Sequence, residues 1–402
     1  MAPAKSKTTK KTTKKTTKTK AGSGTSLQQA MAGLSKALPM DDIVNHLDNQ
    51  TLREAAPHIP TGSLTIDYLI GGIPNHYGVR PCPGIPRGKI MNLYGEPGAG
   101  KTTLALTMSA STAALGGTVA YIDFENEVEP RYAEVLGVPV TDPSKFVLLQ
   151  PSTLEEGFKI MWAMAQSGVD LIVVDSVGAG VPEDWFKSDN KGEQGRVGLV
   201  AAKWSKFLPE LKVVAKKSNT AVLGISQLRS KISTGMSRGP TYQAQGGKAW
   251  QFYSCTRMYL RVIQKEKDKV FNHLTGKTDE QMTGTKVKAR LDKCKVSGAV
   301  GHEAEFYLRS GYGIDDERAI IEIALAYNVI TKGGAWYSWT ASDGTLVKGQ
   351  GMVGFRKLLD ARDGAIEEIF NQVEPYLSKQ VKDNGMQTEI EEEPNILEGL
   401  DI

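Results

Sequence analysis

Between residues 90 and 226, short apolar runs alternate with segments of helical length, and this alternation restricts the possible folds more than any other feature. The runs are apolar along their whole length, which is typical of strands covered on both faces. Strands separated by helices form parallel sheets. The sequence therefore predicts an α/β fold, a mostly parallel central sheet covered by helices on both faces. The runs are 90–94, 119–124, 146–149, 171–174 and 221–225, and helices are expected at 102–115, 127–136, 153–167 and 198–217.

The two ends of the chain differ sharply in charge from the middle. Residues 1–20 contain eight lysines and no acid, and residues 383–402 contain seven acids and no base, although the whole chain carries only +4. Segments with so few apolar residues cannot form a core, so both ends are expected to be disordered. We expect a basic arm at 1–24, a helical segment at 25–58, the α/β core at 59–312, a small α+β domain at 313–380 and an acidic tail at 381–402.

Composition argues for a protein of a reducing compartment. The chain has three cysteines, at positions 82, 255 and 294, and no C-x-x-C pair. Disulfide frameworks and zinc sites need more thiols or closer spacing, so neither is expected. No apolar stretch approaches the roughly 18 residues of a membrane helix. We therefore expect a cytoplasmic protein with no membrane partner.

One motif predicts a phosphate-binding loop. It fits G-x-x-x-x-G-K-[ST] and lies between an expected strand and an expected helix. In this context the glycines turn backbone N–H groups toward phosphates, and the helix N-terminus adds its positive end. The lysine reaches the terminal phosphates and the threonine hydroxyl binds Mg²⁺. The predicted ligands are ATP and Mg²⁺, held by Gly95, Glu96, Pro97, Gly98, Ala99, Gly100, Lys101 and Thr102.

Carboxylates follow two other expected strands. Asp175 comes directly after an apolar run, where an acid faces the ligand crevice of a parallel sheet and can hold Mg²⁺ through water. Hydrolysis also needs a group that orients or deprotonates the attacking water. Asp123, Glu125 and Glu127 lie at the end of the second apolar run or just after it, and the residues themselves leave the choice among them open.

Together with further segments along the chain, these motifs resemble the bacterial RecA recombinase family and its phage-encoded relatives. The resemblance covers about residues 58–345, far more than the phosphate loop, and implies a RecA-type P-loop ATPase core. An insertion at 75–86 and the basic arm depart from the family pattern. The segments that carry the resemblance are 59–67, 121–125, 171–177, 217–220, 226–232, 246–253 and 334–338.

The resemblance implies roles for residues around the nucleotide. Glu125 would activate water, Tyr132 would stack on adenine near Glu129, and Gln227 would sense the γ-phosphate. Lys293 and Lys295 would reach into the ATP site of the neighbouring protomer. From the residues alone they lie on one face of a strand, and a solvated strand edge is the alternative interpretation. The remaining residues implied are Thr103 and Ser176 at the nucleotide and Phe252 at the protomer interface.

Two loops would carry DNA, near 180–197 and 228–247. The second loop contains basic residues, glycines and hydroxyl residues but no acid, so it suits a phosphate backbone. It lacks the phenylalanine common in the family, so Met236 or Tyr242 would take that place. The implied DNA-binding residues are Arg196, Arg229, Lys231, Met236, Arg238, Tyr242 and Lys248.

The resemblance implies a function in DNA recombination and repair. The protein would form a helical filament on single-stranded DNA, pair it with homologous double-stranded DNA, and exchange strands with ATP hydrolysis. Two alternatives are a hexameric DNA helicase of the same fold and a non-enzymatic recombination mediator. The intact motif residues argue against the mediator, and the lack of a separate partner-binding domain argues against the helicase.

Overall fold

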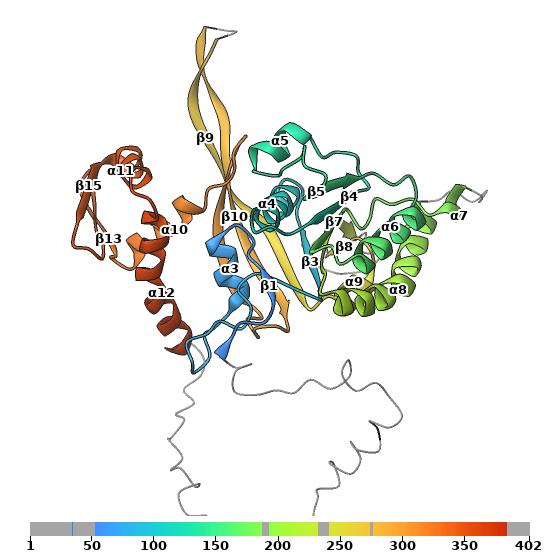
Figure 1. Cartoon of the computed structure of the whole chain (residues 1–402). Helices are drawn as coiled ribbons and strands as arrows, with labels where there is room; N and C mark the ends of the chain where they lie inside the picture. Colours follow the sequence, from blue (N-terminus) through green and yellow to red (C-terminus); the bar gives the residue numbers. More distant parts are fainter. Residues whose placement is uncertain (1–33, 35–52, 187–192, 232–240, 274–275, 384–402) are drawn as a thin grey trace, which may run out of the picture. The chain divides into compact units, whose positions relative to one another are not determined.

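A computed structural model describes residue 34 and residues 53–186, 193–231, 241–273 and 276–383 (Figure 1). The chain divides into two compact units, Met1–Asn49 and Gln50–Ile402, and every element below belongs to the second. The expected basic arm, most of the 25–58 segment and residues 384–402 of the acidic tail lie outside the described residues. Within the described ranges, no helix is both long and apolar enough to cross a membrane.

The centre of the second unit is a ten-stranded sheet. Its strand order is β12-β11-β10-β9-β3-β7-β6-β4-β5, with β8 beside β7. All five apolar runs are strands of this sheet, and the pairs from β5 to β9 along this order are parallel, which confirms the predicted fold class. The strands are β3 (Ile90–Gly95), β4 (Val119–Asp123), β5 (Phe146–Leu149), β6 (Leu171–Asp175), β7 (Ala221–Lys231), β8 (Thr241–Ala244), β9 (Thr256–Asn272), β10 (Lys277–Cys294), β11 (Glu303–Arg309) and β12 (Gly313–Ile314).

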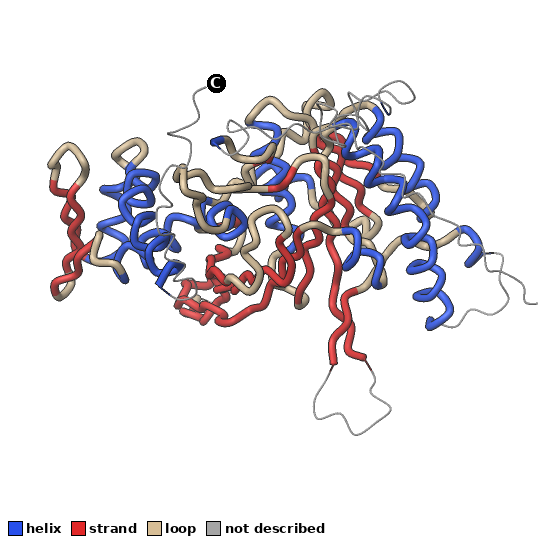
Figure 2. Tube along the Cα trace, turned by 90° about the horizontal axis from the view of Figure 1, so that it is seen from below, coloured by secondary structure: helices blue, strands red, loops and turns tan. Residues whose placement is uncertain are grey.

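Helices cover both faces of the parallel strands. Alternate residues of β3 show this, because Ile90 packs in one apolar cluster while Met91 and Leu93 pack in the other. The cluster with Met91 includes α3 (Leu64–Gly71), α4 (Lys101–Ala114) and α5 (Pro130–Val135). The cluster with Ile90 includes α6 (Leu154–Gln166), α8 (Glu193–Ser218) and α9 (Lys248–Tyr253), and Figure 2 shows helices beside the strands.

One close approach between sheet and helix depends on a glycine. Gly224 of β7 lies under Trp250 of α9, and a Cβ at residue 224 would be 2.2 Å from the indole ring. Gly224→Ala is therefore expected to lower the free energy of unfolding by about 2 kcal/mol through overpacking. Gly198→Ala in α8 is the matched control, because no atom lies within 4 Å of its added Cβ. The control should be neutral or stabilising by about 0.5 kcal/mol. Urea unfolding midpoints of the two variants measure this, and equal shifts would contradict the packing.

Three elements differ from the sequence-based expectation. From its apolar residues the sequence predicts strands at 255–263 and 285–293, whereas β9 and β10 are much longer and pair as one hairpin with 17 and 18 residues. The helix expected at 127–136 is shorter, because α5 begins at Pro130, which occupies its first turn, and Glu129 caps it. The helix expected at 198–217 begins earlier, with α8 at Glu193.

The last elements form a separate apolar cluster. A three-stranded antiparallel sheet, β13-β14-β15, packs with three helices. In β14, Tyr337 and Trp339 point into this cluster, whereas Trp336 is exposed, as the two-residue period of a strand requires. The elements are α10 (Asp316–Ala326), β13 (Ile330–Gly333), β14 (Trp336–Thr340), β15 (Leu346–Gln350), α11 (Gly351–Asp360) and α12 (Ala365–Asp383).

The 75–86 insertion connects α3 with α12. Arg80 donates to the Glu374 carboxylate of α12 at 3.0 Å. Its guanidinium also lies over the Tyr68 ring of α3, 3.8 Å from the centroid. The insertion ends in β2 (Ile85–Pro86), which pairs with β1 (His58–Ile59). A segment outside the family pattern thus joins the core to the last helix.

Candidate nucleotide site

The phosphate loop joins β3 to α4, as predicted. Gly98 and Gly100 have φ of 73° and 77°, a region that favours glycine. A Cβ at Gly100 would lie 2.1 Å from Leu308 of β11, so no larger residue fits there without movement. The first N–H groups of α4 have no partner within the helix. The loop therefore presents backbone donors at a helix N-terminus, an arrangement that suits phosphate groups.

Lys101 is held in the mouth of this loop. Its Nζ donates to the carbonyl oxygens of Gly95 at 3.2 Å and Glu96 at 2.8 Å, and the residue is 8% exposed. Burial lowers the pKa of Lys101, while the nearby carboxylates of Asp175, Glu125 and Glu96 act in the opposite direction. The ammonium group of Lys101 thus donates to neutral carbonyl oxygens. A charged phosphate oxygen would be a stronger acceptor for this ammonium group than a carbonyl oxygen is.

Thr102 and Asp175 meet at the adjacent strand end. The Thr102 hydroxyl donates to Asp175 Oδ2 at 2.7 Å, and the Tyr121 hydroxyl donates to the same oxygen at 2.9 Å. Burial raises the pKa of Asp175 to about 6, and the negative charges of Glu125 and Asp123 also act to raise it. Hard oxygen ligands of this kind fit Mg²⁺, whose charge would favour the ionised carboxylate.

The structure distinguishes among the three carboxylates at the end of β4. Asp123 is buried and accepts from the backbone N–H groups of Glu125 and Val128, both at 3.1 Å. It also accepts from the Gln150 amide at 3.3 Å. Glu127 is exposed. Asp123 therefore holds the turn in shape, and Glu127 lies on the surface of the turn.

Glu125 is bonded to side chains from two other strands. The Gln227 amide of β7 donates to its carboxylate oxygens at 2.9 and 3.0 Å. The hydroxyl of Ser176, directly after β6, also donates to Oε1. The charge of Glu125 acts on both Lys101 and Asp175, and the charge of Asp123 acts on Asp175. The structure thus brings Glu125, Gln227 and Ser176 together.

Of the expected adenine-side residues, Tyr132 lies next to the first turn of α4. The Tyr132 and Thr103 hydroxyls are 3.2 Å apart, with Tyr132 half-buried. Glu129 accepts from the Arg131 N–H at 3.3 Å and thereby caps α5. Its carboxylate thus has a structural use, and Tyr132 supplies the aromatic face beside the loop.

Lys293 is not free in solvent. Its Nζ donates to the carbonyls of Gln251 at 2.7 Å and Phe252 at 3.0 Å, at the end of α9. Burial lowers the pKa of Lys293, and the charges of Lys295 and Arg257 lower it further. The cationic side chain therefore sits where a helix end presents carbonyl oxygens.

The prediction that Lys293 and Lys295 lie on one strand is correct for Lys293 alone. Lys293 belongs to β10, but the strand ends at Cys294, so Lys295 lies outside it and is exposed. A register shift between Leu291 and Lys293 also breaks the regular alternation. Phe252 is 73% exposed, so it is not an ordinary core residue.

Much of the predicted DNA surface lies outside the described residues. Met236 and Arg238 belong to residues 232–240, and the side chains of Arg196, Arg229, Lys231 and Tyr242 are likewise not described. The described part shows that the second loop begins and ends as a strand pair, with residues 228–231 opposite 241–244 (Figure 2). Lys248 is exposed at the start of α9.

Near the first predicted loop, one lysine is engaged by acids. Lys203 Nζ lies 2.6 Å from a carboxylate oxygen of Glu155 and 2.5 Å from one of Asp184. Asp184 belongs to the short helix α7 (Glu183–Phe186). Lys203 therefore ties α7 to α6 and α8.

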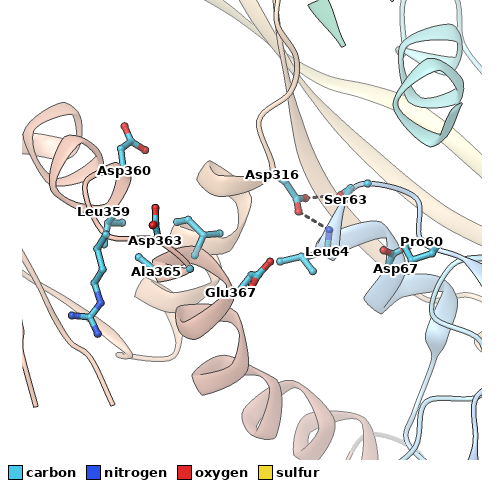
Figure 3. Close-up of a pocket in the computed structure, with 14 residues that line it drawn as sticks. Pro60, Ser63, Leu64, Asp67, Asp316, Leu359, Asp360, Asp363, Ala365 and Glu367 are labelled. Atoms are coloured by element: carbon cyan, nitrogen blue, oxygen red, sulfur yellow. Dashed lines mark hydrogen bonds between the residues drawn. The ribbon is translucent and has the colours of Figure 1, made fainter. Parts of the chain in front are cut away.

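A pocket of about 630 Å³ lies elsewhere, between α3 and the segment that joins α11 to α12 (Figure 3). Asp316 accepts from the Ser63 hydroxyl at 2.5 Å and the Leu64 N–H at 2.6 Å. Burial raises the pKa of the neighbouring Asp67 to about 7. None of the residues that line this pocket belongs to the phosphate loop. Among the described residues, no group of three His, Cys, Asp or Glu is arranged to hold a metal ion.

The fold and the site define the class: an α/β P-loop protein with a glutamate poised beside the phosphate loop. The RecA N-terminal domain family matches residues 25–315. Protein RecA of Thermus thermophilus is 37% identical over 318 residues, 78% of this chain and 84% of that protein. Protein RecA of Bordetella pertussis is 35% identical over 356 residues, 88% and 91% of the two chains. The chain belongs to the RecA family and is an ATP-dependent recombinase.

A solved structure, described as the RadB recombinase, is also similar. It has a TM-score of 0.44 and 22% identity, over 64% of this chain and 98% of that chain. The relatives named Protein RecA confirm the resemblance found in the sequence, and they do not favour the helicase or the mediator.

Proposed function

We propose that this protein hydrolyses ATP with Mg²⁺ when bound to single-stranded DNA, and exchanges DNA strands as a helical filament. The observation that carries the proposal is the bond between Glu125 and Gln227. The Gln227 carbonyl also accepts from the Gln245 N–H at 2.9 Å, where the second predicted DNA loop returns. One residue therefore contacts both the proposed catalytic carboxylate and the base of the proposed DNA loop.

The residues of the loop would act on the phosphates. Backbone N–H groups and Lys101 neutralise charge on the oxygens and position the reacting phosphate. Thr102 directly and Asp175 through water would hold Mg²⁺, which when bound supplies charge neutralisation to the phosphate oxygens. Tyr121 keeps the Asp175 carboxylate oriented toward Thr102 through its bond to Oδ2.

Glu125 would take a proton from the attacking water. Its two oxygens accept from Gln227 and Ser176. A ligand that draws the Gln227 amide away would free a Glu125 oxygen to accept a hydrogen bond from the attacking water. Gln227 would thereby couple the state of the DNA loop to hydrolysis.

Neighbouring protomers would share each site. Phe252 and Lys293 are adjacent, since Lys293 donates to the Phe252 carbonyl, and the Phe252 ring is exposed. Docking of this ring onto a second copy would bring Lys293 and Lys295 toward that copy's phosphates. A head-to-tail contact that does not close produces a helical filament.

A strand-exchange assay tests the proposal. Circular single-stranded DNA and homologous linear duplex should yield joint molecules and exchanged products only when ATP and Mg²⁺ are present. Heterologous duplex is the control and should yield none. Unwinding of a forked duplex without any homologous strand would support the helicase instead, and products formed without ATP would contradict the ATP-dependent mechanism.

A further inference from the structure

The chain leaves β6 beside Glu125 and runs toward the first predicted DNA loop. Ser176 donates to the Glu125 carboxylate, and the N–H of the next residue, Val177, donates to the carbonyl of Ile225 at 2.9 Å. The Val177 carbonyl accepts from the indole Nε1 of Trp204 at 2.8 Å. The segment that precedes the first loop is therefore held by β7 on one side and by α8 on the other.

The second predicted DNA loop returns to the core at Gln245. Its N–H donates to the Gln227 carbonyl at 2.9 Å, directly beyond the pairing of β7 with β8. The Gln227 amide in turn donates to Glu125. The two side chains that donate to Glu125 therefore lie at the ends of different loops, Ser176 before the first loop and Gln227 before the second.

Two glycines bring the ends of these loops into contact. A Cβ at Gly178 would lie 2.1 Å from Gln245 Oε1 and 2.7 Å from Gln245 Cβ, so the Gln245 side chain packs directly on the Gly178 backbone. A Cβ at Gly246 would lie 2.5 Å from a methyl carbon of Val177. We call Val177, Gly178, Gln245 and Gly246 together the loop junction.

The loop junction completes a closed ring of contacts that includes Glu125. One half of the ring runs from Glu125 to Ser176 and along the chain to Gly178. The other half runs by hydrogen bonds from Glu125 to Gln227 and on to Gln245. The packing of Gln245 on Gly178 joins the two halves. Because closely packed groups compress little, a shift of one loop end displaces the other.

We propose that Gln245 is a positioning residue whose side chain holds the ends of the two DNA loops together, so that both loops act on Glu125 as one unit. When single-stranded DNA binds, Ser176 and Gln227 then change their hydrogen bonds to Glu125 together. Without the contact, a Glu125 carboxylate released by one donor stays held by the other. This inference rests on the proposed function, in which DNA at the loops raises ATP hydrolysis.

The first test is ATP turnover by full-length Gln245→Ala at saturating single-stranded DNA. The substitution removes the amide group that packs on Gly178 and keeps the backbone N–H that donates to Gln227. Turnover should fall about tenfold, a usual size for the coupling between two sites, while the KM for ATP and the affinity for single-stranded DNA stay unchanged. Gln166→Ala, which truncates an exposed glutamine of α6, is the control and should leave all three values unchanged.

A conservative variant separates packing from other effects of the truncation. Gln245→Met keeps the length of the side chain, so it should restore about half of the turnover or more. Failure of this variant to restore turnover would mean that hydrogen bonding by the amide is what matters, and would overturn the inference.

The other side of the contact supplies a second test. Gly178→Ala places a methyl group against Gln245 and should also lower turnover about tenfold. The double variant Gly178→Ala/Gln245→Ala should lose about tenfold as well, whereas two independent effects would multiply to about 100-fold. Gly354→Ala in α11 is the control, because no atom lies within 4 Å of its added Cβ. Urea unfolding shows which variants are folded, and Gln245→Ala against Gln245→Met decides the role if Gly178→Ala is not.

Three further results would overturn the inference. They are full turnover in Gln245→Ala, a lower turnover that weaker DNA binding explains, and a loss of about 100-fold in the double variant. An unchanged protein whose ATP hydrolysis does not respond to single-stranded DNA would contradict the proposed function and this inference together. Stimulation that is equal in the unchanged protein and in Gln245→Ala would overturn this inference alone.

Discussion

Replacing Lys101 with alanine should nearly abolish ATP hydrolysis while leaving the fold in place. The side chain is buried in the loop mouth, and its two hydrogen bonds go to loop carbonyls. Its loss removes the one cationic side chain within the motif, and a single preorganised donor of this kind contributes about 10²- to 10³-fold to turnover. Steady-state turnover with saturating single-stranded DNA measures the effect.

Lys159→Ala is the control for Lys101→Ala. Lys159 is an exposed lysine of α6, so its removal should change neither turnover nor stability by a measurable amount. Urea unfolding of both variants shows whether the fold is retained. A folded Lys101→Ala protein with full turnover would contradict the assignment of the site.

Mixing two inactive variants should recover activity if protomers share the site. Glu125→Gln and Lys293→Ala should each reduce turnover about 100-fold or more. In an equal mixture along a head-to-tail filament, a site has an intact Glu125 and receives an intact Lys293 in about a quarter of cases. Turnover in the mixture should therefore approach a quarter of that of the unchanged protein.

The control mixture combines Glu125→Gln with Lys101→Ala. Both residues belong to the same protomer's site, where the charge of Glu125 acts on the buried Lys101, so every site in this mixture keeps one defect. No activity should return. Equal recovery in both mixtures, or none in either, would contradict the role of Lys293 in a neighbouring site.

The nucleotide site could be predicted because its chemistry is local in sequence. The phosphate loop needs a glycine pattern between a strand and a helix, and Asp175 needs only a buried strand before it. The choice of Glu125 among three acids required the family resemblance, since all three follow the same strand. In the structure the Asp123 carboxylate accepts from two backbone N–H groups, whereas the Glu125 carboxylate accepts from Gln227.

Other features of the fold and the site have no recognisable pattern in the sequence. Tyr121 orients Asp175, but it lies within an apolar run, where a tyrosine reads as one more core residue. The full length of the β9–β10 hairpin has no apolar signal in the sequence, because residues 264–283 alternate charges rather than apolar groups and cross-strand pairing decides their conformation. Lys295 was placed in a strand because the register shift before Lys293 leaves no mark in the sequence.

Strand β3, which leads into the phosphate loop, pairs with strands that are synthesised much later. Ile90 pairs with Val222 and Met91 with Thr256, separations of 222 − 90 = 132 and 256 − 91 = 165 residues. Such distant pairings carry a large loop-closure entropy and fold slowly. On the ribosome, the loop that binds phosphates cannot be enclosed until about residue 260 has emerged. The nascent chain therefore exposes an apolar β3 while the 165 residues up to Thr256 are synthesised, an interval in which a chaperone can bind it.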